Sequence, residues 1–209
     1  MKILSLISFF VLCCVLTSRS QNINNSKTDT LTVPYTYWWQ SGGPFIGLCG
    51  DPYSLVFTGT VTKINKPETP VTLNGDSSIV LYTPQFCIIE INDIKIKNNP
   101  KEAYENSIDK NSMIEKYFKS DCFYSLRLNE GDKVIVFVYS YENEYSIPSN
   151  SILKIDNFDD PIVLSIEAYI KNNQDPLSIK ADTRIWSKYG LDNALKQIID
   201  CRLSVKNEK

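Results

Sequence analysis

The side chains with the clearest potential for chemistry are four aromatic residues near the N-terminus, Tyr35, Tyr37, Trp38 and Trp39. Exposed Trp and Tyr rings form stacking surfaces for sugars, peptides or partner proteins. The same rings bury a large apolar area when they close one end of a β-barrel. Of these two interpretations we favour the hydrophobic lid, and we keep the four residues as the candidate ligand-binding site.

Catalysis by histidine is excluded because the chain contains no histidine. This removes histidine general acid–base chemistry, Ser-His-Asp triads and histidine metal sites. A Gly-rich phosphate loop and a G-x-S-x-G elbow are also absent from the sequence. A cysteine nucleophile normally needs histidine as its base. We therefore predict no catalytic residues, no cofactor and no metal.

Paired carboxylates are the remaining route to hydrolysis, since two such groups can cleave a glycosidic bond. The nearest candidates are Asp51, Asp76, Glu90 and Asp93. Their spacing follows no motif, and solvation at the surface explains acidic residues of this kind. A secreted, carboxylate-dependent hydrolase stays as an alternative function.

Two further polar segments have simple explanations. The loop with Asp156, Asp159 and Asp160 gathers oxygen ligands suitable for calcium, but it lacks the EF-hand pattern and is better explained as a solvated loop. Residues 141–145 combine two tyrosines with acidic residues and predict an exposed hairpin tip, again interpreted as a solvated turn.

The chain has six cysteines, of which Cys49, Cys87, Cys122 and Cys201 lie beyond residue 20. An even number in an exported chain predicts two disulfides, with three possible pairings. The absence of a CxxC spacing argues against a zinc knuckle and a thioredoxin-type motif. The alternative is that one or more of the cysteines are free, buried thiols.

The first twenty residues are typical of a secretory signal. Lys2 supplies the positive end, and residues 3–16 form an apolar run too short to span a bilayer. Residues 18–20 place serines at the −3 and −1 positions of a cleavage site before Gln21. An N-terminal membrane anchor is the alternative, but no stop-transfer flank follows the run. We expect a secreted, periplasmic or extracellular protein with no membrane insertion after signal removal.

The formal net charge is −2, and no basic run of five or more residues occurs. A chain of this kind has no electrostatic footprint for nucleic acid or for an anionic membrane. We therefore predict a protein or carbohydrate partner and no nucleic acid.

Alternating apolar residues predict strands over residues 53–65, 79–82, 86–97, 122–128, 133–139, 145–155 and 161–170. A helix competes for 161–170, where β-branched residues favour a strand. A shift of the apolar phase at Asn92-Asp93 predicts a β-bulge. The continuous apolar run 134–138 predicts a central strand covered on both faces. Helical spacing predicts helices over 101–119 and 191–203.

Three segments, taken in order, resemble the netrin-like module shared with tissue inhibitors of metalloproteinases. They are Cys49-Gly50 followed by residues 55–61, the strand 86–91, and Asp121-Cys122-Phe123 followed by residues 131–137. The resemblance covers residues 49–140 and implies an OB-type five-stranded barrel. It also implies a pairing of Cys49 with Cys122, which leaves Cys87 to pair with Cys201.

The sequence departs from those inhibitors at its start. Their mature chains begin with a cysteine whose amine and carbonyl bind the target's zinc, whereas this chain is expected to begin at Gln21. Protease inhibition of the netrin-like type is therefore only an alternative function.

We predict a mainly β (α+β) fold, an OB-like five-stranded barrel with an inserted helix and a C-terminal helix. The expected organisation is a signal peptide at 1–20, a polar lead-in with the aromatic segment at 21–48, the barrel at 49–170, and a helical extension packed on the barrel at 171–209. The predicted function is non-enzymatic binding of an unidentified partner, because folds of this class carry their function in grafted sites.

Overall fold

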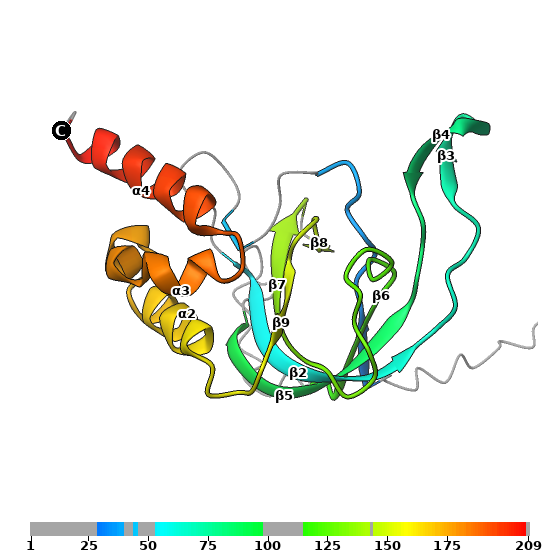
Figure 1. Ribbon diagram of the computed structural model, residues 1–209, viewed down its shortest axis with the longest axis horizontal. Coiled ribbons are helices and arrows are strands. Elements are labelled where there is room, and N and C mark those ends of the chain that lie inside the picture. Colours follow the sequence, from blue (N-terminus) through cyan, green and yellow to red (C-terminus); the bar gives the residue numbers. More distant parts are fainter. Residues whose placement is uncertain (1–28, 40–43, 46–52, 98–114, 143, 208–209) are drawn as a thin grey trace, which may run out of the picture.

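The computed structural model describes residues 29–39, 44–45, 53–97, 115–142 and 144–207. As predicted, the fold is mainly β, with helices toward the C-terminus (Figure 1). The strands are β1 (Thr30–Thr32), β2 (Leu55–Ile64), β3 (Val71–Leu73), β4 (Asp76–Tyr82), β5 (Cys87–Lys97), β6 (Tyr117–Ser120), β7 (Lys133–Tyr141), β8 (Glu144–Ser146) and β9 (Ile152–Ile155). The helices are α2 (Pro161–Lys171), the 3₁₀ helix η1 (Pro176–Asp182), α3 (Thr183–Ser187) and α4 (Asp192–Asn207).

The main sheet has the strand order β1-β6-β5-β2-β7-β8, with β9 also paired to β7. Among the named strands of this sheet, β1 and β6 run parallel and the other pairs are antiparallel. The two ends of this order touch at an isolated bridge, where the Thr36 N–H donates to the Ile147 carbonyl at 3.0 Å. No continuous ladder closes the sheet into a barrel among the described residues. The hairpin β3–β4 is a separate arm (Figure 1).

The long strands β2 and β5 are strongly curved (Figure 1) because their pairing is interrupted by bulges. The register passes from Thr58 opposite Asp93 to Gly59 opposite Ile91, which leaves Asn92 unpaired. The predicted bulge is thereby confirmed. Gly59 permits the close approach of the strands, since a Cβ there would clash with the Ile89 side chain and lie 2.7 Å from the Glu90 carbonyl oxygen.

Strand β7 separates two hydrophobic clusters. Its even-numbered residues, Val134 to Val138, face an inner cluster inside the curved sheet, together with Phe57 from β2. Its odd-numbered residues, Ile135 to Tyr139, face an outer cluster shared with the helices. All of these side chains are buried, so the prediction of a central strand covered on both faces is confirmed.

Residues 161–170 are helical, so the strand predicted there is wrong, and among the described residues the helices begin at Pro161. The Asp160 carboxylate accepts from the Ile162 N–H at 3.0 Å, and a proline at the first position suits a helix start. Burial follows the helical period: Ile162, Ile166 and Tyr169 are buried, while Leu164 is 60% exposed. Packing of one helical face on the sheet outweighs the strand propensity of the β-branched residues.

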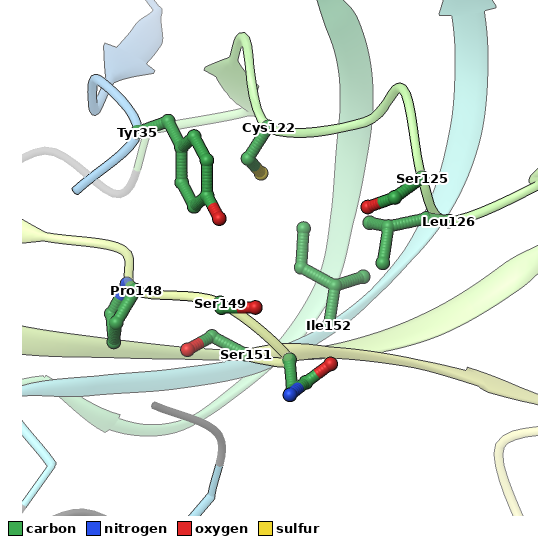
Figure 2. Close-up of a pocket in the computed structure, with 9 residues that line it drawn as sticks. Tyr35, Cys122, Ser125, Leu126, Pro148, Ser149, Ser151 and Ile152 are labelled. Carbon is green, nitrogen blue, oxygen red and sulfur yellow. The ribbon is translucent and has the colours of Figure 1, made fainter. Parts of the chain in front are cut away.

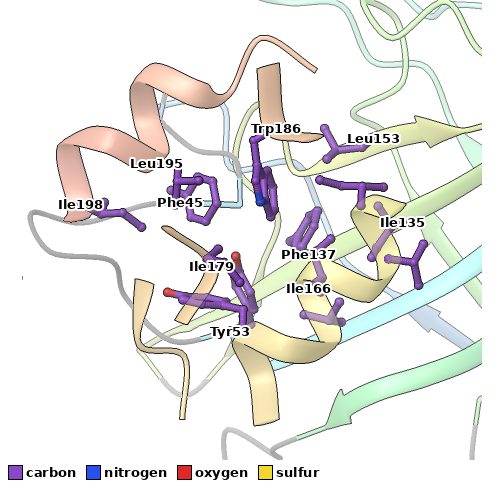
Figure 3. Packing of buried hydrophobic residues seen from close by; sticks show 14 of the residues in the cluster. Phe45, Tyr53, Ile135, Phe137, Leu153, Ile166, Ile179, Trp186, Leu195 and Ile198 are labelled. Carbon is purple, nitrogen blue, oxygen red and sulfur yellow. The ribbon is translucent and has the colours of Figure 1, made fainter. Parts of the chain in front are cut away.

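The predicted C-terminal helix is confirmed as α4, which buries Leu195, Ile198 and Ile199 in the outer cluster. Trp186 of α3 is fully buried at the centre of this cluster (Figure 3). Its ring centroid lies 4.5 Å from that of Phe45, and its Nε1–H donates to Ser165 Oγ at 3.0 Å. A buried indole needs such an acceptor, so the helices are fixed to one another as well as to the sheet.

Three other predicted elements differ from the structure. Most of the helix predicted at 101–119 lies outside the described residues, but its end, Tyr117–Ser120, is strand β6. The strand predicted at 122–128 is an isolated bridge at Cys122 followed by a turn. The strand predicted at 145–155 is divided into β8 and β9 by the loop that carries Asn150 at φ 58°. Within the described part of the chain, no helix is long and apolar enough to cross a membrane.

Candidate functional site

The predicted aromatic residues are brought together by a ring that the sequence analysis did not single out, Tyr82 at the end of β4. The Tyr82 ring packs edge-on against Tyr35, with centroids 5.3 Å apart, and stacks on Tyr37 at 5.1 Å. Tyr37 in turn contacts Trp38 edge-on at 5.2 Å. The result is a continuous row, Tyr35–Tyr82–Tyr37–Trp38, which we call the aromatic row. Offset and edge-on arrangements of this kind are favourable for aromatic quadrupoles.

Asp121 holds one end of the aromatic row in place. Its carboxylate accepts from the Tyr35 N–H at 2.8 Å and from the Tyr82 hydroxyl at 3.1 Å. The side chain is only 8% exposed, and it makes no ion pair with a described residue. Burial of Tyr82 and the negative charge of Asp121 raise the pKa of the Tyr82 hydroxyl to about 12. The hydroxyl therefore stays a hydrogen-bond donor at neutral pH.

The adjacent tryptophans Trp38 and Trp39 have different environments, so the two interpretations of the aromatic segment must be judged for each residue separately. Trp39 is partly buried against the outer cluster, and its ring lies 6.2 Å from those of Tyr139 and Tyr141. Trp38 is 64% exposed. Trp39 packs on the outer cluster and does not close the end of a barrel, so the lid interpretation stays a prediction, whereas Trp38 is displayed.

Trp38 lines a cleft of about 440 Å³, which we call the aromatic cleft. The lining comes from the segment after β1 and from the β7–β8 hairpin: Pro34, Tyr35, Thr36, Trp38, Tyr141, Glu142, Glu144, Tyr145 and Ser146. The bridge between Tyr35 and Ile147 places these two segments side by side. The tip of the hairpin, interpreted from the sequence as a solvated turn, therefore forms one wall of the cleft.

Two smaller hollows share Tyr35 with the cleft. One, of about 210 Å³, lies between Tyr82 and Tyr124. The other, of about 10 Å³, is lined by Tyr35, Cys122 and Ser151, among others (Figure 2). Ser151 Oγ is buried without a hydrogen-bond partner among the described residues. A polar hollow of this size suits a single water molecule and is too small for a larger ligand.

The cysteines do not pair as the netrin-like resemblance implies, and this expectation is corrected. Cys87 and Cys122 are free thiols, while Cys201 is disulfide-bonded. Cys49 lies outside the described residues. Cys87 belongs to the inner cluster, whereas α4, which carries Cys201, packs on the opposite face of the sheet, so the two sulfur atoms cannot meet. Burial raises the pKa of both free thiols to about 12, which makes them poor nucleophiles.

The described carboxylates that were candidates for hydrolysis each contact a different partner and do not form a pair. Glu90 lies 3.4 Å from Lys116 Nζ, and Asp93 lies 2.6 Å from Lys95 Nζ. Asp76, on the arm, accepts hydrogen bonds from the backbone N–H and hydroxyl of Ser78, and these lower its pKa. Asp51 lies outside the described residues.

The acidic loop before α2 has a structural role at one of its members, since Asp160 caps the helix. In the described ranges, no group of three or more Cys, Asp or Glu side chains is arranged to hold a metal ion.

Comparison of the chain with protein-family models, with curated proteins and with solved structures gives no match. The netrin-like resemblance therefore stays a prediction, and the argument for function rests on the site. The lining of the aromatic cleft offers four aromatic rings, three of them tyrosines, together with two carboxylates and the aliphatic hydroxyls of Thr36 and Ser146, and it contains no lysine or arginine. Such a lining can stack on a ligand and accept its hydrogen bonds, and it disfavours anions.

Proposed function

We propose that this chain is a secreted, non-enzymatic binding protein whose ligand occupies the aromatic cleft. One observation carries the proposal: Trp38 is 64% exposed at the edge of a cleft that three tyrosines also line. An exposed tryptophan beside other rings leaves apolar surface in water, which is typical of a surface that binds a partner. The volume of about 440 Å³ falls in the usual range for small-ligand sites.

The fold supports this role by supplying a rigid frame. The curvature of β2 and β5, together with the bridge between Tyr35 and Ile147, favours an OB-like arrangement, in which binding surfaces lie on the sheet and its loops. The row of packed rings and the two hydrogen bonds to Asp121 hold the Tyr35 segment before any ligand arrives. A preorganised site loses less entropy on binding.

Secretion is proposed from the signal-peptide pattern of residues 1–20, and the disulfide bond of Cys201 supports it. Cys201 is disulfide-bonded, and disulfides persist mainly in oxidising compartments. The proposal is tested by expressing the full chain in an exporting host and sequencing the N-terminus of the product. A start at Gln21 supports it, and retention of residues 1–20 on an intracellular product contradicts it.

The absence of catalysis is proposed because the described candidate carboxylates are bound to lysines or lie apart. Glu90 and Asp93 each pair with their own lysine, which is a structural role rather than that of an acid–base pair. Turnover of a panel of nitrophenyl glycosides by the purified protein, lost in Glu90→Gln, would overturn this and favour the hydrolase.

The binding role is tested by ligand-observed NMR on the exported protein with a panel of small probes: methyl glucoside, choline, acetate and 3,3-dimethylbutan-1-ol. We expect at least one probe to bind, with binding weakened in Trp38→Ala and in Tyr141→Ala. Leu164→Ala, which removes a similarly exposed apolar side chain from α2, is the control and should bind as the wild type does. Equal binding by Trp38→Ala and the wild type would contradict the proposal.

A further inference from the structure

We infer that the group recognised in the aromatic cleft is an organic cation, an ammonium or a guanidinium. This inference rests on the proposed binding function and names the ligand class for the same cleft. Two independent features of the lining support it: the electrostatic charge of the β7–β8 hairpin and the identity of the rings that face the cleft.

The charge of the cleft is negative and is not neutralised by a lysine or arginine of the described residues. Glu142 and Glu144 both line it, and neither forms an ion pair with a described residue. In contrast, Glu90, Asp93, Glu115, Asp132 and Glu167 each lie within ion-pair distance of a lysine elsewhere on the sheet. A pair of carboxylates left without a protein cation attracts a cationic ligand and repels an anionic one.

The aromatic rings of the cleft add a cation–π attraction, which a neutral ligand of the same shape does not have. The face of an aromatic ring carries negative potential, and tryptophan is the strongest cation–π partner, followed by tyrosine. Trp38 is 64% exposed and Tyr141 is 49% exposed, so both rings are accessible to a ligand. Tyr35 and Tyr145 complete the aromatic lining. Aromatic side chains with neighbouring carboxylates are the arrangement by which proteins recognise ammonium groups.

The backbone fixes the carboxylates at this position. Glu142 has φ 49°, a left-handed conformation that turns the chain at the end of β7. Strand β8 then pairs Glu144 with Tyr141, so an acidic residue lies opposite a ring of the same cleft. Tyr141, Tyr145 and both carboxylates therefore come from one hairpin, while Tyr35 and Trp38 come from the segment after β1.

The cation can belong to a free amine or to a lysine or arginine side chain of a peptide, and the probes distinguish these sources. Choline and its neutral isostere 3,3-dimethylbutan-1-ol have the same shape and differ in charge. Acetyl-Gly-Lys-Gly-amide and acetyl-Gly-Arg-Gly-amide present the cation on a peptide, and acetyl-Gly-norleucine-Gly-amide is their neutral control. Binding is measured by calorimetry and by fluorescence, since Trp38 is far more exposed than the fully buried Trp186.

We expect choline to bind on the order of tenfold more tightly than its neutral isostere. Glu142→Gln/Glu144→Gln should reduce that preference at least several-fold while keeping the fold, as judged by circular dichroism. The matched control is Asp156→Asn/Asp159→Asn, which removes the same charge from exposed residues outside the cleft lining and should leave the preference unchanged. Tighter binding of the lysine or arginine peptide than of choline assigns the cation to a peptide partner; the reverse assigns it to a free amine.

The inference is overturned if the neutral isostere, or methyl glucoside, binds at Trp38 as tightly as choline does; the proposed binding function then stands without a cation. If no probe binds the wild type, or if binding is indifferent to Trp38→Ala, both the proposed function and this inference fail. An equal loss of preference in the control variant would show a general effect of net charge and would also overturn the inference.

Discussion

Replacing Asp121 by asparagine tests whether the buried carboxylate orders the aromatic row. In the wild type it accepts from the Tyr35 N–H at 2.8 Å and the Tyr82 hydroxyl at 3.1 Å. Hydrogen bonds to a charged group contribute about 1.5–3 kcal/mol each to stability. Asparagine keeps one acceptor oxygen for the Tyr35 N–H and turns its NH₂ group toward the Tyr82 hydroxyl, which can accept from it, so both bonds lose their charged partner.

An opposing contribution comes from desolvation. The Asp121 side chain is 8% exposed and has no ion-pair partner among the described residues, so asparagine removes the cost of burying a charge. That relief offsets part of the loss. We expect Asp121→Asn to lower the free energy of unfolding by about 2 kcal/mol.

The assay is urea unfolding followed by circular dichroism, in a double-mutant cycle with Tyr82→Phe. Tyr82→Phe alone should cost about 2 kcal/mol, the value of one hydrogen bond to a charged group. Because the two residues share that bond, Asp121→Asn should cost about 1 kcal/mol less in the Tyr82→Phe background. Tyr124→Phe is the control, since Tyr124 is 56% exposed and lines the same hollow as Tyr82. An unchanged urea midpoint for Asp121→Asn, or the same cost in both backgrounds, would refute the reasoning.

Three further outcomes are expected. Gly59→Ala should lower the free energy of unfolding in urea by about 2–4 kcal/mol, because the new methyl group meets the backbone of the neighbouring strand. A decrease of less than about 0.5 kcal/mol would contradict the close approach of the two strands. Cys87, which is buried, should react with a thiol reagent only after unfolding. Because the pKa of Cys87 and of Cys122 is raised to about 12, the contribution of these thiols to stability is present at neutral pH and is lost as the pH rises from the ordinary thiol range toward 12. Cys87→Ala should reduce that fall in a pH series of melting temperatures. Trp39→Ala should cost about 3 kcal/mol and Trp38→Ala less than half of that, since only Trp39 packs on the outer cluster; equal melting temperatures for the two variants would be inconsistent with this difference.

The sequence predicted the parts of the fold in which local pattern and tertiary burial agree. The run 134–138 became a strand buried on both faces, and the phase shift near Asn92 became a bulge. The failure at 161–170 has a definite cause. Alternation of apolar residues is compatible with either secondary structure when β-branched residues occupy both sides of the pattern, and the cap at Asp160 with Pro161 was the signal for a helix.

The sequence predicted most of the aromatic residues of the candidate site, but it did not predict which distant residues pack against them. The four aromatic residues from 35 to 39 stand out in any reading of the sequence, and three of them, Tyr35, Tyr37 and Trp38, form the aromatic row. Tyr82 and Asp121 join them through contacts across 39 to 86 residues of chain, and no local pattern encodes contacts at such separations. The disulfide expectation failed for a related reason: Cys87 lies in the inner cluster, whereas α4, which carries Cys201, packs on the outer cluster, and no local pattern encodes which face of the sheet a distant helix covers.

The end of strand β7 contributes one tyrosine to the hydrophobic core and one to the aromatic cleft. Tyr139 is buried in the outer cluster, and two residues later Tyr141 is 49% exposed in the cleft. Both side chains lie on the same face of the strand, since strand residues alternate in direction. Trp39 contacts both rings at 6.2 Å and so links the helix-covered core to the wall of the cleft. Loss of Trp39 should therefore weaken ligand binding indirectly, by releasing Tyr141, whereas loss of Trp38 removes a contact to the ligand itself. Rescue of binding in Trp39→Phe, with no such rescue in Trp38→Leu, is the result that separates support of the cleft from contact with its ligand.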